Sequence, residues 1–169
     1  GKDDLALYSE ATGDWTLRLS SLNYASYTLN HGGLGYKQVG GDFNGGGRDD
    51  VAVYGEAAGY WLYIYAETVT AGYQSFGQEG YEPVTGDYDG DGRTDLALFD
   101  AATGSWYVKL SGSGGAVVTA EGLFGESDDE PVIADYDGDE KADLMLHKKK
   151  GGKWKVKLSG SDYATLDLD

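Results

Sequence analysis

The sequence predicts an all-β fold, a β-propeller built of four-stranded antiparallel blades, and a repeat carries this prediction. Four tryptophans are spaced 46, 45 and 48 residues apart, at Trp15, Trp61, Trp106 and Trp154. Four aspartates have the same three spacings, at Asp4, Asp50, Asp95 and Asp143, and each opens a short apolar run. No window shows the 3.6-residue period of a helix. Four strands in a repeat of this length are typical of a propeller blade.

The third unit shows the expected order of elements most clearly, because Gly and Asp clusters bound each apolar run. Its expected elements are a strand at 83–86, an acidic loop at 87–95, a strand at 96–99, a turn at 101–105, and strands at 106–110 and 117–124. The tryptophan occupies one equivalent position in every unit. Repetition at every unit favours packing between blades over a ligand site.

The repeat indicates a single repeat domain over 1–169. Its blade units are expected at 1–36, 37–80, 81–128 and 129–169. The first unit lacks its first strand, because the sequence starts inside an acidic loop, and about 3.75 blades are therefore expected. Open sheet edges are a liability that natural proteins avoid. We therefore expect a larger ring, completed either by a longer polypeptide or by association with another copy.

Composition narrows the classes of partner. The chain has 29 acidic and 13 basic residues, for a formal net charge of −16, and no cysteine. We do not expect this acidic chain to bind nucleic acid, because phosphate binding depends on basic patches. Disulfides and thiolate metal sites are excluded. No apolar run is long enough for membrane insertion, and any secretion signal would lie outside this segment.

The acidic loop at 87–95 predicts a calcium site. Its expected ligands are the side chains of Asp87, Asp89, Asp91 and Asp95 and the backbone carbonyl of Arg93. Gly92 allows the sharp turn that such a loop needs. Calcium fits because it accepts six or more oxygens in irregular geometry, whereas magnesium demands a tighter octahedron. An EF-hand is excluded, because Leu98 stands at position 12 and a strand follows the loop.

Two further loops repeat this pattern, so we expect two complete calcium sites and a third, weaker one. The fourth unit offers Asp135, Asp137, Asp139, Asp143 and the carbonyl of Lys141, with Glu140 in place of the turn glycine. The second unit offers Asp42, Asn44, Asp50, the carbonyl of Arg48, and at Gly46 only a backbone carbonyl or a water. Glu140 either strains its turn or supplies an extra oxygen. The first unit retains only Asp4.

These motifs resemble the FG-GAP repeats of integrin α-subunit propellers and their bacterial relatives, the VCBS-like repeats. The resemblance rests on Phe76-Gly77, Pro83 and Gly86 ahead of the loop at 87–95, and on Phe124-Gly125 and Pro131 ahead of the loop at 135–143. Leu34-Gly35 departs mildly from the first Phe-Gly. The resemblance implies a seven- or eight-bladed propeller, calcium between the first two strands of a blade, and an extracellular or cell-surface setting. It implies no single activity, because the fold hosts many functions.

Beyond calcium, three functions remain open. One is a secreted structural, cell-adhesion or carbohydrate-binding module, in which tyrosines stack on a glycan or meet a protein surface; the candidates are Tyr24, Tyr27, Tyr36, Tyr60, Tyr63, Tyr65, Tyr73 and Tyr81. Another is part of a polysaccharide lyase or hydrolase. His31 and His147 are the only histidines, and no catalytic constellation appears, so we predict no enzyme here. The third is a self-assembling surface-structure subunit.

A lysine cluster interrupts the acidic background in the last unit. It comprises Lys148, Lys149, Lys150, Lys153, Lys155 and Lys157. One interpretation is charge compensation on an edge strand that lysines protect from aggregation. The other is docking of an acidic surface or an anionic glycan.

Overall fold

The computed structural model describes residues 4–120, 124–161, 163 and 165–168. The strands in these residues form four antiparallel sheets, of which the first has three strands and the others have four. Three short 3₁₀ helices accompany them, η1 (Ser20–Leu22), η2 (Glu56–Ala58) and η3 (Ser159–Ser161). The all-β prediction is confirmed. No helix in the described residues is long and apolar enough to cross a membrane.

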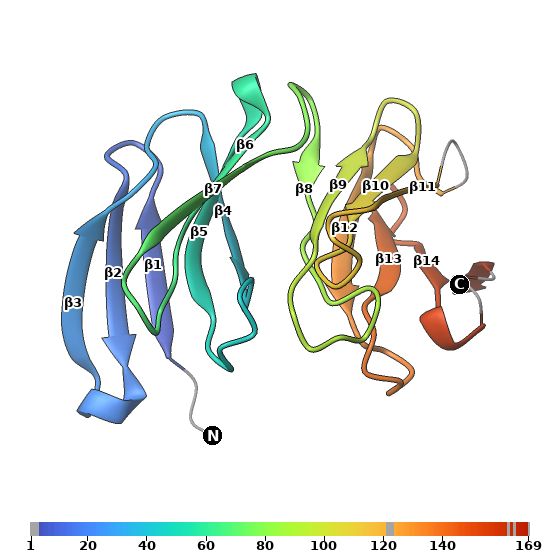
Figure 1. Cartoon of the computed structure of the whole chain (residues 1–169). Helices are drawn as coiled ribbons and strands as arrows, with labels where there is room; N and C mark the ends of the chain where they lie inside the picture. The colour runs from blue at the N-terminus through green and yellow to red at the C-terminus, as the bar shows by residue number, and fades with distance from the viewer. Residues whose placement is uncertain (1–3, 121–123, 162, 164, 169) are drawn as a thin grey trace.

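The sheets follow one another side by side in chain order (Figure 1). The first contains β1 (Leu5–Ser9), β2 (Asp14–Leu19) and β3 (Ala25–Asn30), and the second contains β4 (Tyr36–Gly41), β5 (Asp50–Gly55), β6 (Tyr60–Ile64) and β7 (Ala71–Ser75). The third contains β8 (Glu82–Pro83), β9 (Leu96–Asp100), β10 (Ser105–Lys109) and β11 (Val117–Ala120), and the fourth contains β12 (Asp129–Ala134), β13 (Asp143–Lys148), β14 (Trp154–Lys157) and β15 (Thr165–Leu168). They do not close into a ring within the described residues.

The third sheet differs from its prediction at two strands. β8 is shorter than the expected strand at 83–86, yet an isolated bridge between Gly86 and Asp95 continues its register. The ladder is interrupted between these points, where only the Val84 N–H reaches across to the carbonyl of Ala97. The expected last strand at 117–124 includes residues 121–123, which lie outside the described residues. The division of the chain into blade units stays a prediction.

The third sheet packs face to face against the second and the fourth, and its second strand, β9, contributes to both interfaces. All five residues of β9 are buried, and their side chains alternate between two cores. Leu96 and Leu98 pack against Trp61 of the second sheet, whereas Ala97 and Phe99 pack against the fourth sheet. Complete burial of a leucine such as Leu98 stabilises the fold by about 2 kcal/mol. This two-sided burial explains why the second strands are apolar at nearly every position.

The repeated tryptophan has the same role in successive sheets. Trp61 and Trp106 lie in the two inter-sheet cores, which confirms the prediction that they pack between sheets. In three sheets the indole N–H donates to a main-chain carbonyl beyond the next turn: Trp15 to His31 (3.0 Å), Trp61 to Phe76 (2.7 Å) and Trp106 to Phe124 (2.8 Å). Each indole also packs on the ring near the end of the second strand, at Tyr8, Tyr54, Phe99 or His147. His147 therefore takes the place of an aromatic ring, with its centroid 4.5 Å from that of Trp154.

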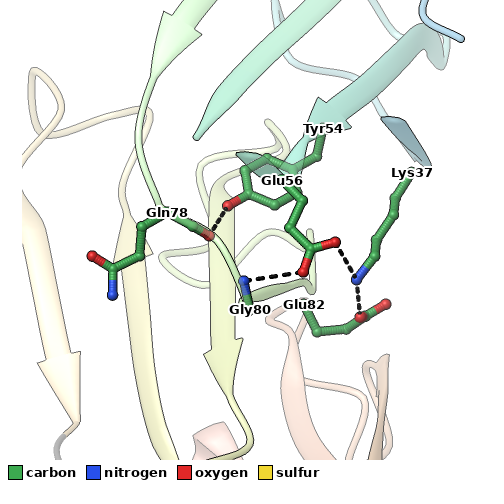
Figure 2. Close-up of polar contacts among 6 residues, drawn as sticks. All are labelled: Lys37, Tyr54, Glu56, Gln78, Gly80 and Glu82. Atoms are coloured by element: carbon green, nitrogen blue, oxygen red, sulfur yellow. Dashed lines mark hydrogen bonds and ion pairs between the residues drawn. The ribbon is translucent and has the colours of Figure 1, made fainter. Parts of the chain in front are cut away.

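Polar contacts tie the second sheet to the segment that leads into the third (Figure 2). The Tyr54 hydroxyl donates to the carbonyl of Gln78 at 2.9 Å, and the Gly80 N–H donates to the Glu56 carboxylate at 3.0 Å. Lys37 forms ion pairs with Glu56 at 3.7 Å and with Glu82 of β8 at 2.6 Å. These contacts fix the position of β8 beside β9 at the start of the third sheet.

The lysine cluster is not on an edge strand. β14 lies between β13 and β15, so the prediction that the lysines protect an edge strand is wrong. The fourth strand, β15, pairs with the outer edge of β14. Four lysines instead face nearby carboxylates, pairing as Lys148–Glu126, Lys155–Glu126, Lys149–Glu130 and Lys150–Asp128. The charge-compensation part of the interpretation is confirmed.

Candidate metal centre

The three acidic loops occupy the same place in successive sheets. Each joins the first strand of a sheet to the second, and backbone hydrogen bonds link each loop to the next. The Thr94 N–H donates to the carbonyl of Asp42 at 2.8 Å, and the Ala142 N–H donates to the carbonyl of Asp87 at 2.6 Å. Gly86 precedes the third-sheet loop, and a Cβ there would lie only 2.7 Å from the Cβ of Ala142. Glycine thus lets neighbouring loops approach closely.

The first aspartate organises each loop. Asp87 accepts hydrogen bonds from the N–H groups of Gly90 (2.7 Å), Asp91 (3.2 Å) and Gly92 (2.8 Å). Gly90 and Gly92 have φ angles of 79° and 82°, a left-handed conformation that glycine adopts without steric cost. The chain therefore wraps around one carboxylate. Asp135 accepts the corresponding bonds in the fourth sheet.

In two loops, three carboxylates converge. One oxygen from each of Asp87, Asp89 and Asp95 lies within 4.8 Å of the others, and Asp135, Asp137 and Asp143 form an equivalent group. Such groups can hold a metal ion, because an ion relieves the repulsion between neighbouring carboxylates. The loop at 42–50 contributes no such group within the described residues. The carbonyls of Arg93, Lys141 and Arg48 stay predicted ligands.

Asp91 and Asp139, each the fifth residue of its loop counted from the first aspartate, are not part of these groups. Asp91 accepts hydrogen bonds from the Ser111 hydroxyl (3.0 Å) and from the Arg93 N–H (2.9 Å). Asp139 accepts the equivalent bond from the Ser159 hydroxyl at 2.8 Å. Sequence reasoning missed these serines, and metal ligation by Asp91 and Asp139 stays a prediction.

The last aspartate of each loop is a tether as well as a candidate ligand. Asp95 is fully buried, and its two oxygens accept the N–H groups of Tyr88 (2.8 Å) and Ser111 (2.6 Å). Four aspartates bond the N–H of the residue 16 positions later, in the pairs Asp4–Ser20, Asp50–Ala66, Asp95–Ser111 and Asp143–Ser159. A carboxylate has about four acceptor sites, so each can still bind a cation. The constant spacing was a signal that sequence reasoning could have used.

Burial and hydrogen bonding act against each other on these carboxyls. Burial raises the pKa of Asp95 above its ordinary value, the N–H groups of Ser111 and Tyr88 oppose this, and Asp89 raises it further. Burial would also raise the pKa of Asp143, but its bonds with Ser159 and Tyr136 together hold it below the ordinary value. A nearby cation favours the charged form of every carboxyl in both groups.

In the second-sheet loop the fifth residue is Gly46, which has no side chain. The carboxylate of Glu67, from outside the loop, occupies the space where that side chain would lie. A Cβ on Gly46 would lie 2.5 Å from an oxygen of Glu67, and Glu67 accepts a hydrogen bond from the Asn44 amide at 3.0 Å. In the other two sheets the residue matching Glu67 is a glycine. A Cβ on Gly112 would lie 2.5 Å from Asp91, and one on Gly160 would lie 2.6 Å from Asp137. In each of the three sheets a carboxylate therefore lies at this point, supplied by the loop itself or by the turn opposite.

This exchange predicts strong coupling between positions 46 and 67. Gly46→Asp alone should destabilise the chain by about 1–2 kcal/mol, because it places a second carboxylate against Glu67. The double variant with Glu67→Gly should recover most of that loss, with a coupling energy of about 1 kcal/mol or more. Urea unfolding of the four proteins of the cycle measures it. Strictly additive effects would contradict the exchange.

Glu140 adopts the left-handed conformation that Gly92 adopts in the third sheet, with φ of 70°. Its N–H still donates to Asp135, at 3.0 Å. Because this conformation costs a non-glycine residue about 1 kcal/mol, Glu140→Gly should stabilise the chain by up to that amount. Urea unfolding measures the gain. Glu140→Ala, which keeps the strain and removes the charge, is the control, and equal effects of the two changes would contradict a backbone origin.

The fold and these loops define an all-β repeat protein with an acidic loop between the first two strands of successive sheets. Residues 87–146 match the family model described as FG-GAP-like repeat, so this segment is similar to that repeat. The matched segment spans both groups of three carboxylates. The resemblance predicted from the motifs is confirmed. Searches of curated proteins and of solved structures found no match.

Proposed function

We propose that this chain is an extracellular calcium-binding module of the FG-GAP type, in which calcium clamps the loop between the first two strands of a sheet. The observation that carries the proposal is the convergence of three carboxylates at the same place in two successive sheets. Each ion would join the start of a loop, through Asp87, to its end, through Asp95. The function of the ions is then structural, and recognition takes place elsewhere on the surface.

The chemistry of these groups suits calcium. They offer hard oxygen ligands from carboxylates, and backbone carbonyls and waters would complete the six to eight that calcium takes. Because each ion carries two positive charges, three ions would bring the formal net charge from −16 to −10. Extracellular calcium modules bind with dissociation constants of about 10⁻⁴–10⁻³ M, which suits a secreted or cell-surface protein.

The proposal is tested by calcium titration calorimetry. We expect two sites per chain, with the second-sheet loop as a weaker third. Asp89→Asn and Asp137→Asn should each remove one strong site, whereas Glu10→Gln, an equal loss of charge in an exposed turn of the first sheet, should remove none. A heat of calcium binding that neither Asp89→Asn nor Asp137→Asn alters would contradict the proposal, as would magnesium binding of equal affinity.

The exposed face of the first sheet favours a propeller-type ring completed by further blades, which either a longer polypeptide or a second copy would supply. Leu5 and Leu7 occupy the positions of Leu96 and Leu98, yet they are 57% and 72% exposed against 8% and 0%. Leu96 and Leu98 pack on Trp61 of the preceding sheet. The tryptophan of the last sheet, Trp154, is itself 36% exposed. The last sheet of one copy would cover the first sheet of the next. A folded monomer at all concentrations in analytical ultracentrifugation with calcium would contradict the association.

We further propose that this segment is a binding module and not an enzyme. His147 packs on Trp154, and the Nε2 atom of His31 is buried with no hydrogen-bond partner among the described residues. Among the described residues, neither histidine belongs to a group of side chains that could hold a metal ion. We therefore propose no catalytic role for this segment.

A further inference from the structure

A cavity of about 440 Å³ opens between the second and third sheets. Its wall is formed by the loops at 42–50 and 87–95, by residues of β6, β7, β9 and β10, and by residues that follow β6 and β10. No acidic side chain among the described residues lines it, although the sequence has 29 acidic residues. The side chains on which the argument depends are Phe43, Tyr63, Tyr65, Gln74, Arg93 and Lys109. A volume of this size is typical of small-molecule sites.

Two cations on this wall have no anionic partner among the described residues. The Lys109 ammonium lies 5.9 Å from the centroid of the Phe76 ring, and the Arg93 side chain runs beside Gly45. Neither forms an ion pair, whereas Lys37 pairs with two glutamates nearby. In a chain with a net charge of −16, unpaired cations around one cavity point to an anionic ligand.

The rest of the wall combines aromatic rings with hydrogen-bonding groups. The ring of Phe43 stacks on that of Tyr63, with centroids 5.6 Å apart and planes at 21°, and Tyr65 packs on the same tyrosine at 5.4 Å. Gly72 makes room for them, since a Cβ there would lie 2.5 Å from the Tyr63 ring. Burial raises the pKa of Tyr63 to about 12, so its hydroxyl stays neutral. The Gln74 amide adds donors and an acceptor.

We propose that this cavity binds an acidic saccharide of the hexuronate class. The sugar carboxylate would lie between Arg93 and Lys109, the apolar face of the ring would rest on the aromatic wall, and Gln74 would bond a hydroxyl. A simple carboxylate or phosphate would leave the aromatic wall unused, and a neutral sugar would leave both cations unpaired. The site goes beyond calcium binding and is separable from it, because only the backbone carbonyl of Arg93 is a predicted calcium ligand.

The test is calorimetric titration with di-galacturonate, using maltose as the neutral disaccharide and acetate as the bare carboxylate, with and without calcium. Di-galacturonate should bind at least ten-fold more tightly than either control. Arg93→Gln and Lys109→Gln should each weaken it at least ten-fold. Lys149→Gln, which removes the same charge from the fourth sheet, should leave it unchanged. The calcium affinity of Lys109→Gln, a change in β10 outside the acidic loops, should also be unchanged, so that failure of this site is distinguishable from failure of the calcium sites.

Three outcomes of the saccharide titrations would overturn the proposal. They are the absence of di-galacturonate binding to a chain that still binds calcium, equal binding of maltose, and weakening of binding by Lys149→Gln as large as that by Lys109→Gln. Tighter binding of a hexaglutamate peptide than of di-galacturonate would also overturn it, in favour of an acidic protein partner. Comparable near-ultraviolet circular dichroism of the variants and the parent chain controls for folding.

Discussion

Saturating calcium is expected to raise the midpoint of thermal unfolding of this chain by about 10–20 °C over the value in a chelator. At a calcium concentration of 100 times the dissociation constant, each site that exists only in the folded state stabilises it by about 2.7 kcal/mol. Two sites then contribute about 5 kcal/mol, and each kcal/mol shifts the midpoint of a chain of this length by about 2–4 °C. Scanning calorimetry in 10 mM calcium chloride and in EDTA measures the difference.

Two controls assign this stabilisation to the loops. Magnesium at the same concentration should give a much smaller shift, because it resists dehydration and needs a regular octahedron. The double variant Asp89→Asn, Asp137→Asn should lose most of the shift, whereas Glu10→Gln should keep it. A midpoint that is the same in calcium and in chelator would defeat the proposed function.

The repeated second strand shows why much of this fold could be predicted from the sequence. The run from Leu96 to Phe99 is apolar at every position because successive side chains enter different cores. A strand with one solvated face would alternate apolar and polar residues. Recurrence of such a run at the tryptophan period is therefore typical of stacked sheets. Ring closure could not be tested in the same way, since it depends on what covers Leu5 and Leu7.

The candidate site was predicted only in part, because some of its contacts join residues far apart in the chain. The spacing within the loop identified Asp87, Asp89 and Asp95, since neighbouring loop residues necessarily lie close together. Glu67 and Ser111 come from turns beyond the third strand, and their sequence distance from the loops hid them. Each nevertheless lies at a fixed sequence distance from the last aspartate of its loop: Ser111 is 16 residues after Asp95, and Glu67 is 17 residues after Asp50. Comparing the repeats position by position would have found both.

The second large effect is expected at Asp95. Asp95→Ala should destabilise the chain by about 3–5 kcal/mol in EDTA, where calcium contributes nothing. Its carboxylate accepts the N–H groups of Tyr88 and Ser111 at a fully buried position. Removing it leaves both donors unpaired, at about 1–3 kcal/mol each, and opens a small void. Urea unfolding in EDTA measures the loss.

The matched control is Asp91→Ala in the same loop. Asp91 is exposed, and water can replace it as the partner of the Ser111 hydroxyl and the Arg93 N–H. We expect it to cost less than about 1 kcal/mol in EDTA. Equal losses for the two variants would show that the buried carboxylate is not a tether. If the two variants differ in unfolding free energy only in calcium, Asp95 acts through the metal alone. If they already differ in EDTA, Asp95 holds the end of the loop before any ion binds.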